Sequence, residues 1–249
     1  LRSCILPRII HLLRSSFSDA SQELASSFDA TVRDCFEQLT ECTISANPGT
    51  ETQCRLPVSM GGCGLTSMRL IAPAAYLGSW LQVLRDVEQA VGFPVLGPGS
   101  RPTSATTTTA QAEAALNNTL QHLGLERSEA NAWRAASQQP LPKQQKAPTC
   151  LLNTATMRNW REQASAVTTA RLMACRGWGA GAIFEAIPND HSSSTTLHDM
   201  CMRLMFRHRL GLPVVGLNLW CDRCTAQVDP AGNHCHACPG NAGIRHNRL

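Results

Sequence analysis

Lysine is almost missing from this 249-residue chain, and so is any long apolar run. Lys143 and Lys146 are the only lysines, so arginine supplies all but two of the 22 basic side chains, and its planar guanidinium suits paired hydrogen bonds to phosphate. No apolar run reaches the roughly 18 to 20 residues that span a bilayer, and no signal peptide opens the chain. We therefore expect an intracellular protein without a membrane partner.

Apolar and polar residues rarely alternate with a period of two, which argues against a fold built on sheets. Apolar residues recur instead at three- and four-residue steps, most clearly from Asp19 to about Cys42 and from about Pro73 to Val91. Further helices are predicted over 1–13, where Pro7 should introduce a kink, and over 111–123, 126–137, 150–175 and 197–209. The predicted fold is mostly α, with a small hairpin at the C-terminal end.

Segments with helix-breaking residues separate the predicted helices. Residues 43–53 are polar, residues 92–109 are rich in Pro, Gly, Ser and Thr, and residues 138–149 are rich in Pro and Gln, so we expect loops or linkers there. The glycine-rich run from Gly61 to Gly64 lacks the Lys-Ser/Thr ending of a nucleotide-binding loop. A tight structural turn is therefore the favoured interpretation of that run.

The strongest chemical signal lies near the C-terminal end, where six thiol or imidazole groups fall within eighteen positions. They are Cys221, Cys224, His234, Cys235, His236 and Cys238. Four such groups complete a tetrahedral zinc site. One possible set is the double Cys-x-x-Cys, and the other replaces Cys235 with His234 to give Cys-x2-Cys-x9-His-x3-Cys; the spacing leaves both open. Disulfides are the alternative, which a reducing compartment disfavours.

The excess positive charge lies in the same part of the chain. Residues 201–249 carry six arginines and two aspartates, a net charge of +4, which equals the net charge of the whole chain. A basic surface beside a zinc site predicts contact with the phosphates of nucleic acid, whereas a merely solvated helix face is the alternative. The candidate contacts are Arg203, Arg207, Arg209, Arg245 and Arg248.

Short motifs in a fixed order resemble the region that follows the polymerase palm in reverse transcriptases of non-long-terminal-repeat retrotransposons. They are Leu6 to Arg8, Phe28-Asp29, Val32-Arg33, Leu56-Pro57, Gly61 to Leu65, Ala72 to Leu77, Arg209 to Pro213, Cys221, Cys224, Asp229-Pro230, Gly232 to His234, Cys238 and Arg245 to Asn247. The match is weakest over 92–149. This chain departs from the usual pattern in having Asn233 where Asp is common.

In the subgroup with a restriction-like endonuclease, the resemblance implies a helical thumb, a helical linker, a Cys-Cys-His-Cys zinc knuckle and then the nuclease. The implied regions are 1–91 for the thumb, 92–149 for a connector, 150–215 for the linker, and 216–249 for the knuckle and the start of a truncated endonuclease. The resemblance favours Cys221, Cys224, His234 and Cys238 as ligands of a structural zinc ion.

The same resemblance implies a nuclear fragment of a reverse transcriptase that holds RNA template or target DNA and takes no small-molecule substrate. Polymerisation requires paired aspartates that hold magnesium, and the chain contains no Asp-Asp pair, so we expect no catalysis by these residues. The rival hypothesis is a zinc-stapled structural or protein-interaction module from a decayed element copy, without nucleic-acid binding.

Overall fold

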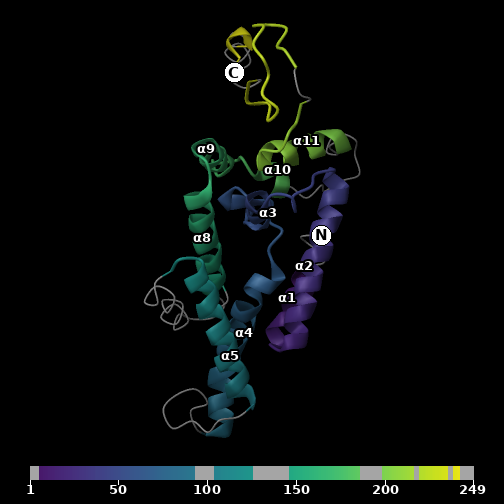
Figure 1. Ribbon diagram of the computed structural model, residues 1–249. Coiled ribbons are helices and arrows are strands. Elements are labelled where there is room, and N and C mark those ends of the chain that lie inside the picture. Colours follow the sequence, from purple (N-terminus) through teal and green to yellow (C-terminus); the bar gives the residue numbers. More distant parts are fainter. Residues whose placement is uncertain are drawn as a thin grey trace. The chain divides into compact units, whose positions relative to one another are not determined.

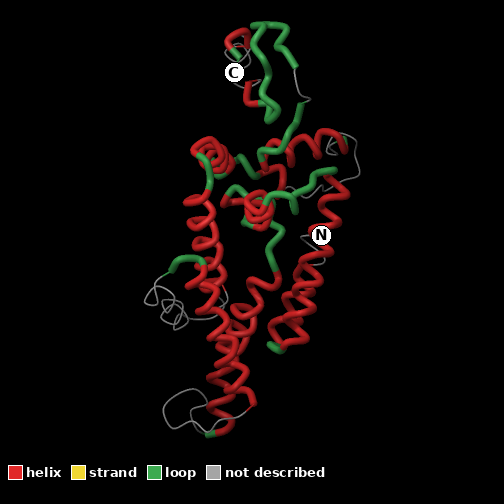
Figure 2. The backbone as a smooth tube through the Cα atoms, in the orientation of Figure 1, coloured by secondary structure: helices red, strands yellow, loops and turns green. Residues whose placement is uncertain are grey.

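The computed structural model describes residues 6–92, 104–125, 146–185, 198–215, 219–234 and 238–241. Across these ranges the regular structure is helical, apart from an isolated antiparallel bridge between Trp220 and Gln227 (Figure 1). Helices and connecting loops make up the described backbone, with no strand in it (Figure 2). The mostly α prediction is confirmed, and the predicted hairpin is reduced to one bridge. None of the described helices has both the length and the apolar content to cross a membrane.

The chain divides into two compact units. The first draws on residues 1–34, 55–57 and 64–163, and the second on residues 35–54, 58–63 and 164–249. Helix α2 (Asp19–Thr40) contributes to both units, so their boundaries differ from the four consecutive segments that the sequence suggested.

Helix α4 is the central element of the first unit because it packs against α1, α5 and α8 (Figure 1). The bounds of these helices are Leu6–Ser15 for α1, Met68–Val91 for α4, Ser104–His122 for α5 and Lys146–Gln163 for α8. One core joins α4 to α5 and α8, and a second joins α4 to α1 and α2. Alanines on α4 at 72, 74 and 75 are buried in these cores, and small side chains let neighbouring helices approach closely.

The core between α4, α5 and α8 follows the helical period on α5. Ala112, Leu116 and Leu120 recur at four-residue steps and are fully buried, and Leu152 of α8 completes the cluster. Burying one such leucine stabilises the fold by roughly 1.5 to 3 kcal/mol. This spacing explains why the sequence pattern located α5, although the helix begins earlier than predicted, at Ser104, and includes the four threonines assigned to a linker.

The second core places Leu6 and Leu13 of α1, seven residues apart, against Met68 and Ile71 of α4. The kink predicted at Pro7 depends on the residues before Leu6, which lie outside the described range, so it stays a prediction. Within the described residues the helix starts at Leu6, so Pro7 lies in the first turn, where its missing N–H needs no partner.

The carboxylate of Asp29 caps the N-terminus of α4 although it belongs to α2. It accepts hydrogen bonds from the backbone N–H groups of Met68 at 2.7 Å and Arg69 at 3.2 Å and from the hydroxyl of Ser67 at 2.5 Å. The guanidinium of Arg55 lies 3.4 Å away and balances its charge. Because the first N–H groups of a helix lack partners within it, this buried carboxylate fixes where α4 begins.

The second unit contains the remaining described helices. Their bounds are Pro48–Arg55 for α3, Val58–Met60 for the short helix η1, Ala166–Cys175 for α9, Ala182–Glu185 for α10, Asp199–Leu210 for α11 and Pro239–Asn241 for the short helix η2. The expectation of a polar loop over 43–53 missed α3. Asn47 caps that helix by accepting hydrogen bonds from the backbone N–H groups of Gly49 at 2.9 Å and Thr50 at 3.2 Å.

The single helix predicted over 150–175 is two helices. Ser165 ends the first and caps the second, since its hydroxyl accepts a hydrogen bond from the N–H of Thr168 at 3.2 Å. Residues 146–149, assigned to a linker, belong to α8. The helix predicted over 126–137 lies outside the described residues.

Arg209 of α11 is buried at the centre of the second unit. Its guanidinium donates hydrogen bonds to the carbonyl oxygens of Gly62 at 2.8 Å, Val58 at 2.8 Å and Ala180 at 3.1 Å, and it lies 4.8 Å from the centre of the Phe184 ring. Buried polar groups must be paired in this way to be tolerated. The run Gly61 to Gly64 therefore belongs to a structural turn, in agreement with the favoured interpretation.

Candidate metal centre

The C-terminal tail begins with a tight turn that carries two of the predicted ligands. The N–H of Thr225 donates to the carbonyl of Cys221 at 2.8 Å, and the N–H of Cys221 donates to the carbonyl of Ala226 at 2.9 Å. Thr225 has a φ of 55°, a left-handed conformation that is uncommon for a residue with a side chain. These bonds hold Cys221 and Cys224 on one turn.

Asp229 positions the third predicted ligand. Its carboxylate accepts hydrogen bonds from the N–H of His234 at 2.7 Å and from the N–H and side-chain amide of Asn233, both at 3.1 Å. Desolvation opposes ionisation of Asp229, but these hydrogen bonds outweigh it and lower the pKa of this carboxyl below its usual value. The ionised side chain therefore acts as a cap that fixes His234.

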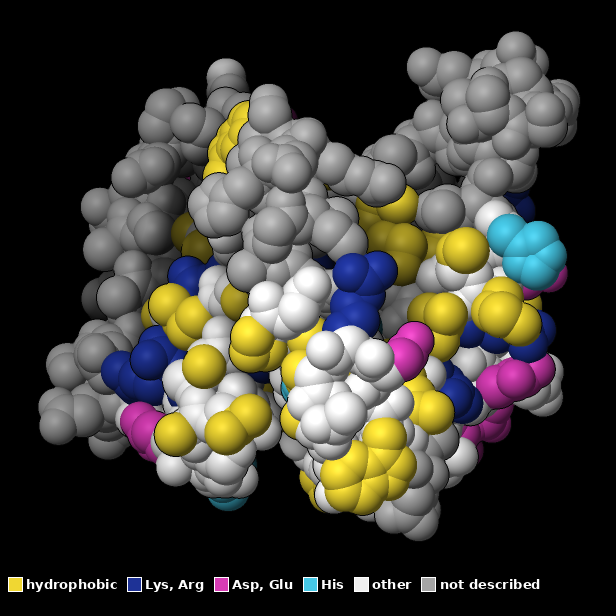
Figure 3. Space-filling view, turned by 90° about the horizontal axis from the view of Figure 1, so that it is seen from above, with side chains coloured by type: hydrophobic (Ala, Val, Ile, Leu, Met, Phe, Trp, Pro, Cys, Tyr) yellow, Lys and Arg dark blue, Asp and Glu magenta, His cyan; other side chains and the backbone are white. Residues whose placement is uncertain are grey.

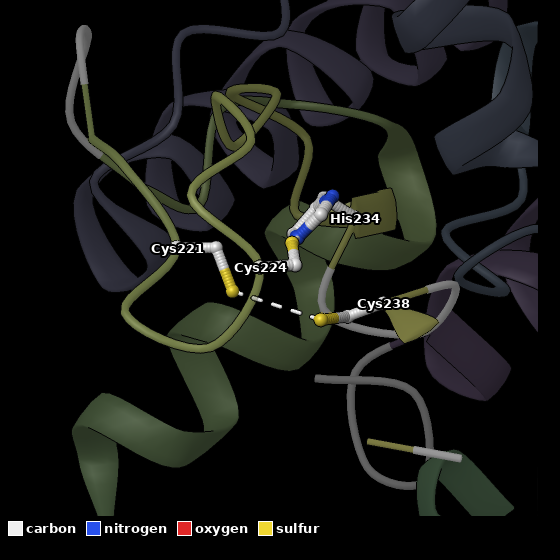
Figure 4. A group of neighbouring side chains, drawn as sticks. All are labelled: Cys221, Cys224, His234 and Cys238. Carbon is white, nitrogen blue, oxygen red and sulfur yellow. Dashed lines mark hydrogen bonds between the residues drawn. The ribbon is translucent and has the colours of Figure 1, made fainter. Parts of the chain in front are cut away.

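The four predicted ligands Cys221, Cys224, His234 and Cys238 come together from separate turns of the tail (Figure 4). All four ligand atoms lie within 4.8 Å of one another. The sulfurs of Cys221 and Cys238 are 3.6 Å apart, and the sulfur of Cys224 is 3.2 Å from Nε2 of His234. Zinc–sulfur bonds of about 2.3 Å at tetrahedral angles place two sulfurs about 3.8 Å apart, so one ion fits this arrangement.

The surroundings of Cys221 lower the pKa of its thiol, which favours metal binding. Hydrogen bonds from the backbone at Arg223, then from the His234 side chain and the backbone at Cys224, lower its pKa to about 6. A metal ligand must be the thiolate, so this shift favours the ligand form at neutral pH. The donor set suits a soft or borderline divalent ion, of which zinc is the common example.

Cys235 and His236, the other candidate ligands, lie outside the described residues. Among the residues that the structure describes, the set that comes together is the one that contains His234.

Arg203 and Arg207, predicted as phosphate contacts, both bind Glu41 at the end of α2. The guanidinium of Arg203 pairs with the Glu41 carboxylate, and that of Arg207 donates to the Glu41 carbonyl at 2.5 Å and to the Pro213 carbonyl at 3.4 Å. Both contacts are exposed, and exposed ion pairs contribute little stability, so phosphate can compete for these arginines. Their role in nucleic-acid contact stays a prediction.

Arg209 requires a correction. It is 4% exposed, and its donors are occupied by carbonyl oxygens of the second unit, so it cannot reach phosphate in this fold. The sequence suggested a surface residue because arginine is seldom buried, and the contacts that bury it come from residues almost 150 positions away. Arg245 and Arg248 lie outside the described residues.

Two exposed residues of the tail were missed as candidates. Trp220 is 63% exposed, and Arg223, which lies between two metal ligands, is also exposed. The signal was present in the sequence as Trp-Cys-x-Arg-Cys, where an aromatic and a basic side chain flank a metal-binding turn. Exposed hydrophobic side chains lie among arginine and acidic side chains on the face shown in Figure 3.

An apolar groove of about 1090 Å³ lies beside the tail within the second unit. Residues of α9 and α11 line it, together with Val214, Val215 and the turn that precedes His234. The N–H of Val214 donates to the carbonyl of Pro230 at 2.7 Å and so joins α11 to the tail.

No known protein family, curated protein or solved structure matches this chain.

Proposed function

We propose that this chain binds nucleic acid, and that one structural zinc ion holds its tail in the form that presents Arg223 and Trp220. The observation that carries the proposal is the convergence of three cysteines and one histidine around a turn whose other side chains include an exposed arginine. Four protein ligands complete a zinc shell and leave no position for a reactive water. The ion therefore serves structure, and the chain itself performs no catalysis.

The charge of the tail supports a polyanionic partner. Residues 201–249 contain six arginines and two aspartates, and the ionised Asp229 is occupied with backbone N–H groups. Arg223 offers a planar donor for phosphate, and the Trp220 ring offers a flat apolar face on which a base can stack. RNA template or target DNA is the proposed partner.

The resemblance to retrotransposon reverse transcriptases supplies the biological setting of the proposal. It implies a nuclear protein in which these helices and the zinc tail hold nucleic acid for a polymerase encoded in the same frame. This origin is tested at the gene: an Asp-Asp pair encoded upstream and an acidic nuclease motif encoded downstream would support it, and their absence from an intact frame would contradict it.

Nucleic-acid binding is tested by fluorescence anisotropy of labelled single-stranded RNA and duplex DNA with the zinc-loaded chain. If phosphates are contacted, affinity falls steeply between about 50 and about 200 mM salt. Arg223→Ala should weaken binding to all sequences and reduce the salt slope by about one. Arg161→Ala, an exposed arginine of α8, is the matched control. No binding, or binding that does not respond to salt, would contradict the proposal.

A zinc-stapled protein-interaction module is the second candidate, and the apolar groove beside the tail favours it. An exposed apolar surface of this extent is typical of sites that contact another molecule. Arg203 pairs with the Glu41 carboxylate and Arg207 donates to the Glu41 carbonyl, and these contacts agree with a structural role for α11. Zinc-dependent folding without any affinity for nucleic acid would favour this candidate over the first.

A further inference from the structure

The turn between α9 and α10 presents a fully exposed tryptophan. Trp178 is 103% exposed, more than any other large hydrophobic side chain in the described part of the chain. A tryptophan that packs into a core or interface typically buries about 150 to 250 Å². Trp178 buries none of that surface against the described residues, so its ring is accessible to a partner.

The turn that carries Trp178 is built to a fixed shape. The N–H of Ala180 donates to the carbonyl of Gly177 at 3.0 Å, and Gly179 has a φ of 75°, which favours glycine. A Cβ on Gly181 would clash with Cγ1 of Val58, so a larger residue there would force Val58 to shift. The exposure of Trp178 is therefore a property of a specific turn.

The buried guanidinium of Arg209 anchors the same turn. It donates to the carbonyl of Ala180 at 3.1 Å while also holding the carbonyls of Val58 and Gly62. The last residues of the turn are thus tied to the interior of the second unit. A side chain carried on a fixed backbone binds a ligand at a lower entropy cost than one carried on a loose loop.

A small hollow of about 270 Å³ adjoins Trp178. Its lining includes Val58, Ser59, Cys175 and Arg176 with the glycines of the turn, and none of the lining residues that the structure describes is acidic. The volume is just below the about 300 to 1,000 Å³ of sites for drug-sized ligands, so it suits a single planar group. Arg176 is exposed beside it and gives the site a positive charge.

We propose that Trp178 is a stacking platform for an unpaired base of single-stranded nucleic acid, with Arg176 placed to bind the neighbouring phosphate. A planar apolar face beside a guanidinium matches a base linked to a phosphate, and a paired base in a duplex is not available to it. The exposed guanidinium of Arg176 in the lining favours this polyanion over a neutral apolar partner. The inference rests on the proposed nucleic-acid binding and adds a site and a strand preference to it.

The test compares three probes of equal length: single-stranded oligothymidylate, a strand of abasic sites with the same phosphates, and a duplex. The zinc-loaded wild type should bind oligothymidylate about 5- to 150-fold more tightly than the abasic strand, the range expected for one stacked base. Trp178→Ala should lower this ratio by about 5-fold or more, leaving only what stacking on Trp220 contributes, and Trp178→Phe should keep most of it. Arg176→Ala should weaken binding to both strands. Leu39→Ala, which alters another exposed apolar side chain of the second unit, is the control.

The outcomes separate this inference from the proposed function. If Trp178→Ala retains the preference for bases over abasic sites, or weakens both probes equally, the stacking site is wrong while nucleic-acid binding stands. If the wild type binds none of the probes, the proposed function fails and the stacking site with it. Binding to phosphatidylserine vesicles that Trp178→Ala abolishes, with the base preference unchanged, would show that Trp178 serves a membrane surface instead.

Discussion

The Nη2 atom of Arg209 donates a hydrogen bond to the carbonyl oxygen of Val58 at 2.8 Å inside the second unit. Through this bond and two others, one arginine ties the loop after α3 and the turn before α10 to helix α11. The carbonyl of Arg209 itself accepts from the buried side chain of Gln53 at 3.0 Å. Arg209 is therefore the polar centre of this unit.

Replacing Arg209 by Lys should destabilise the second unit by about 2 to 4 kcal/mol, because an ammonium cannot reproduce the planar fork and leaves buried carbonyls without donors. Urea unfolding followed by circular dichroism measures the change. Arg161→Lys, made on the exposed face of α8, should shift the free energy of unfolding by no more than about 0.5 kcal/mol. Equal midpoints for the two variants would contradict the role of Arg209.

Because Asp29 of α2 caps α4, its replacement should destabilise the protein more than replacement of Asp34 in the same helix. Asp29→Asn should cost about 1 to 2 kcal/mol, since the amide cannot accept from Met68, Arg69 and Ser67 together and carries no charge to pair with Arg55. Asp34→Asn breaks only an exposed pair with Arg33, so it should cost less than about 1 kcal/mol. Thermal unfolding of both variants measures the difference, and a larger loss for the Asp34 variant would contradict the capping role.

The metal centre predicts one zinc ion for each chain. Native mass spectrometry should find it, and Cys238→Ser should remove it, whereas Cys150→Ser, a change at an exposed free cysteine, should not. Alkylation gives an independent reading: Cys221 and Cys224 should be protected until a chelator is added, because coordinated thiolates react slowly. A metal-free protein whose Cys221 and Cys224 react at once would rule out the centre.

The left-handed residue in the metal-binding turn predicts a stabilising change. A non-glycine residue in this conformation costs about 1 to 2 kcal/mol, part of which glycine recovers, so Thr225→Gly should stabilise the zinc-loaded tail by about 0.5 to 1 kcal/mol. The measurement is the rate at which a chelator removes the ion, which should fall. Ala226→Gly, at a neighbour without positive φ, should raise that rate or leave it unchanged. Faster release from the Thr225 variant would contradict the strain at this position.

The helices that the sequence located best are those whose own residues carry the signal. Helix α2 ends two residues before the predicted limit, and α5 displays its buried face at four-residue steps. The starts of helices were less predictable. Helix α4 begins at Met68 instead of about Pro73. Its N-cap Ser67, which accepts a hydrogen bond from the N–H of Leu70, is a local signal, but the Asp29 carboxylate from α2 that completes the cap is not visible in any local pattern.

The ligands of the metal centre likewise depend partly on local sequence and partly on contacts formed in the fold. Spacing alone left Cys235 and His234 as alternatives, and His234 reaches the cluster in the fold because Asp229 holds its backbone N–H. Asp229 and His234 are close in sequence, so this support was visible in principle as an Asp that caps the next turn. Trp220 and Arg223 could also be seen beside the ligands in the sequence. Their exposure, which only the fold shows, makes them candidates for contact with nucleic acid.

The sequence by itself determined the helical character of this protein and the place of its metal ligands, because helical periodicity and ligand spacing act over a few residues. Only the tertiary structure decided which arginines are free and which tryptophan is exposed. From the side chains alone, Arg209 is expected at the surface and Trp178 in the interior, yet Arg209 is 4% exposed and Trp178 is 103% exposed. Burial depends on what distant segments bring to a residue, and that information is absent from its neighbours in the chain.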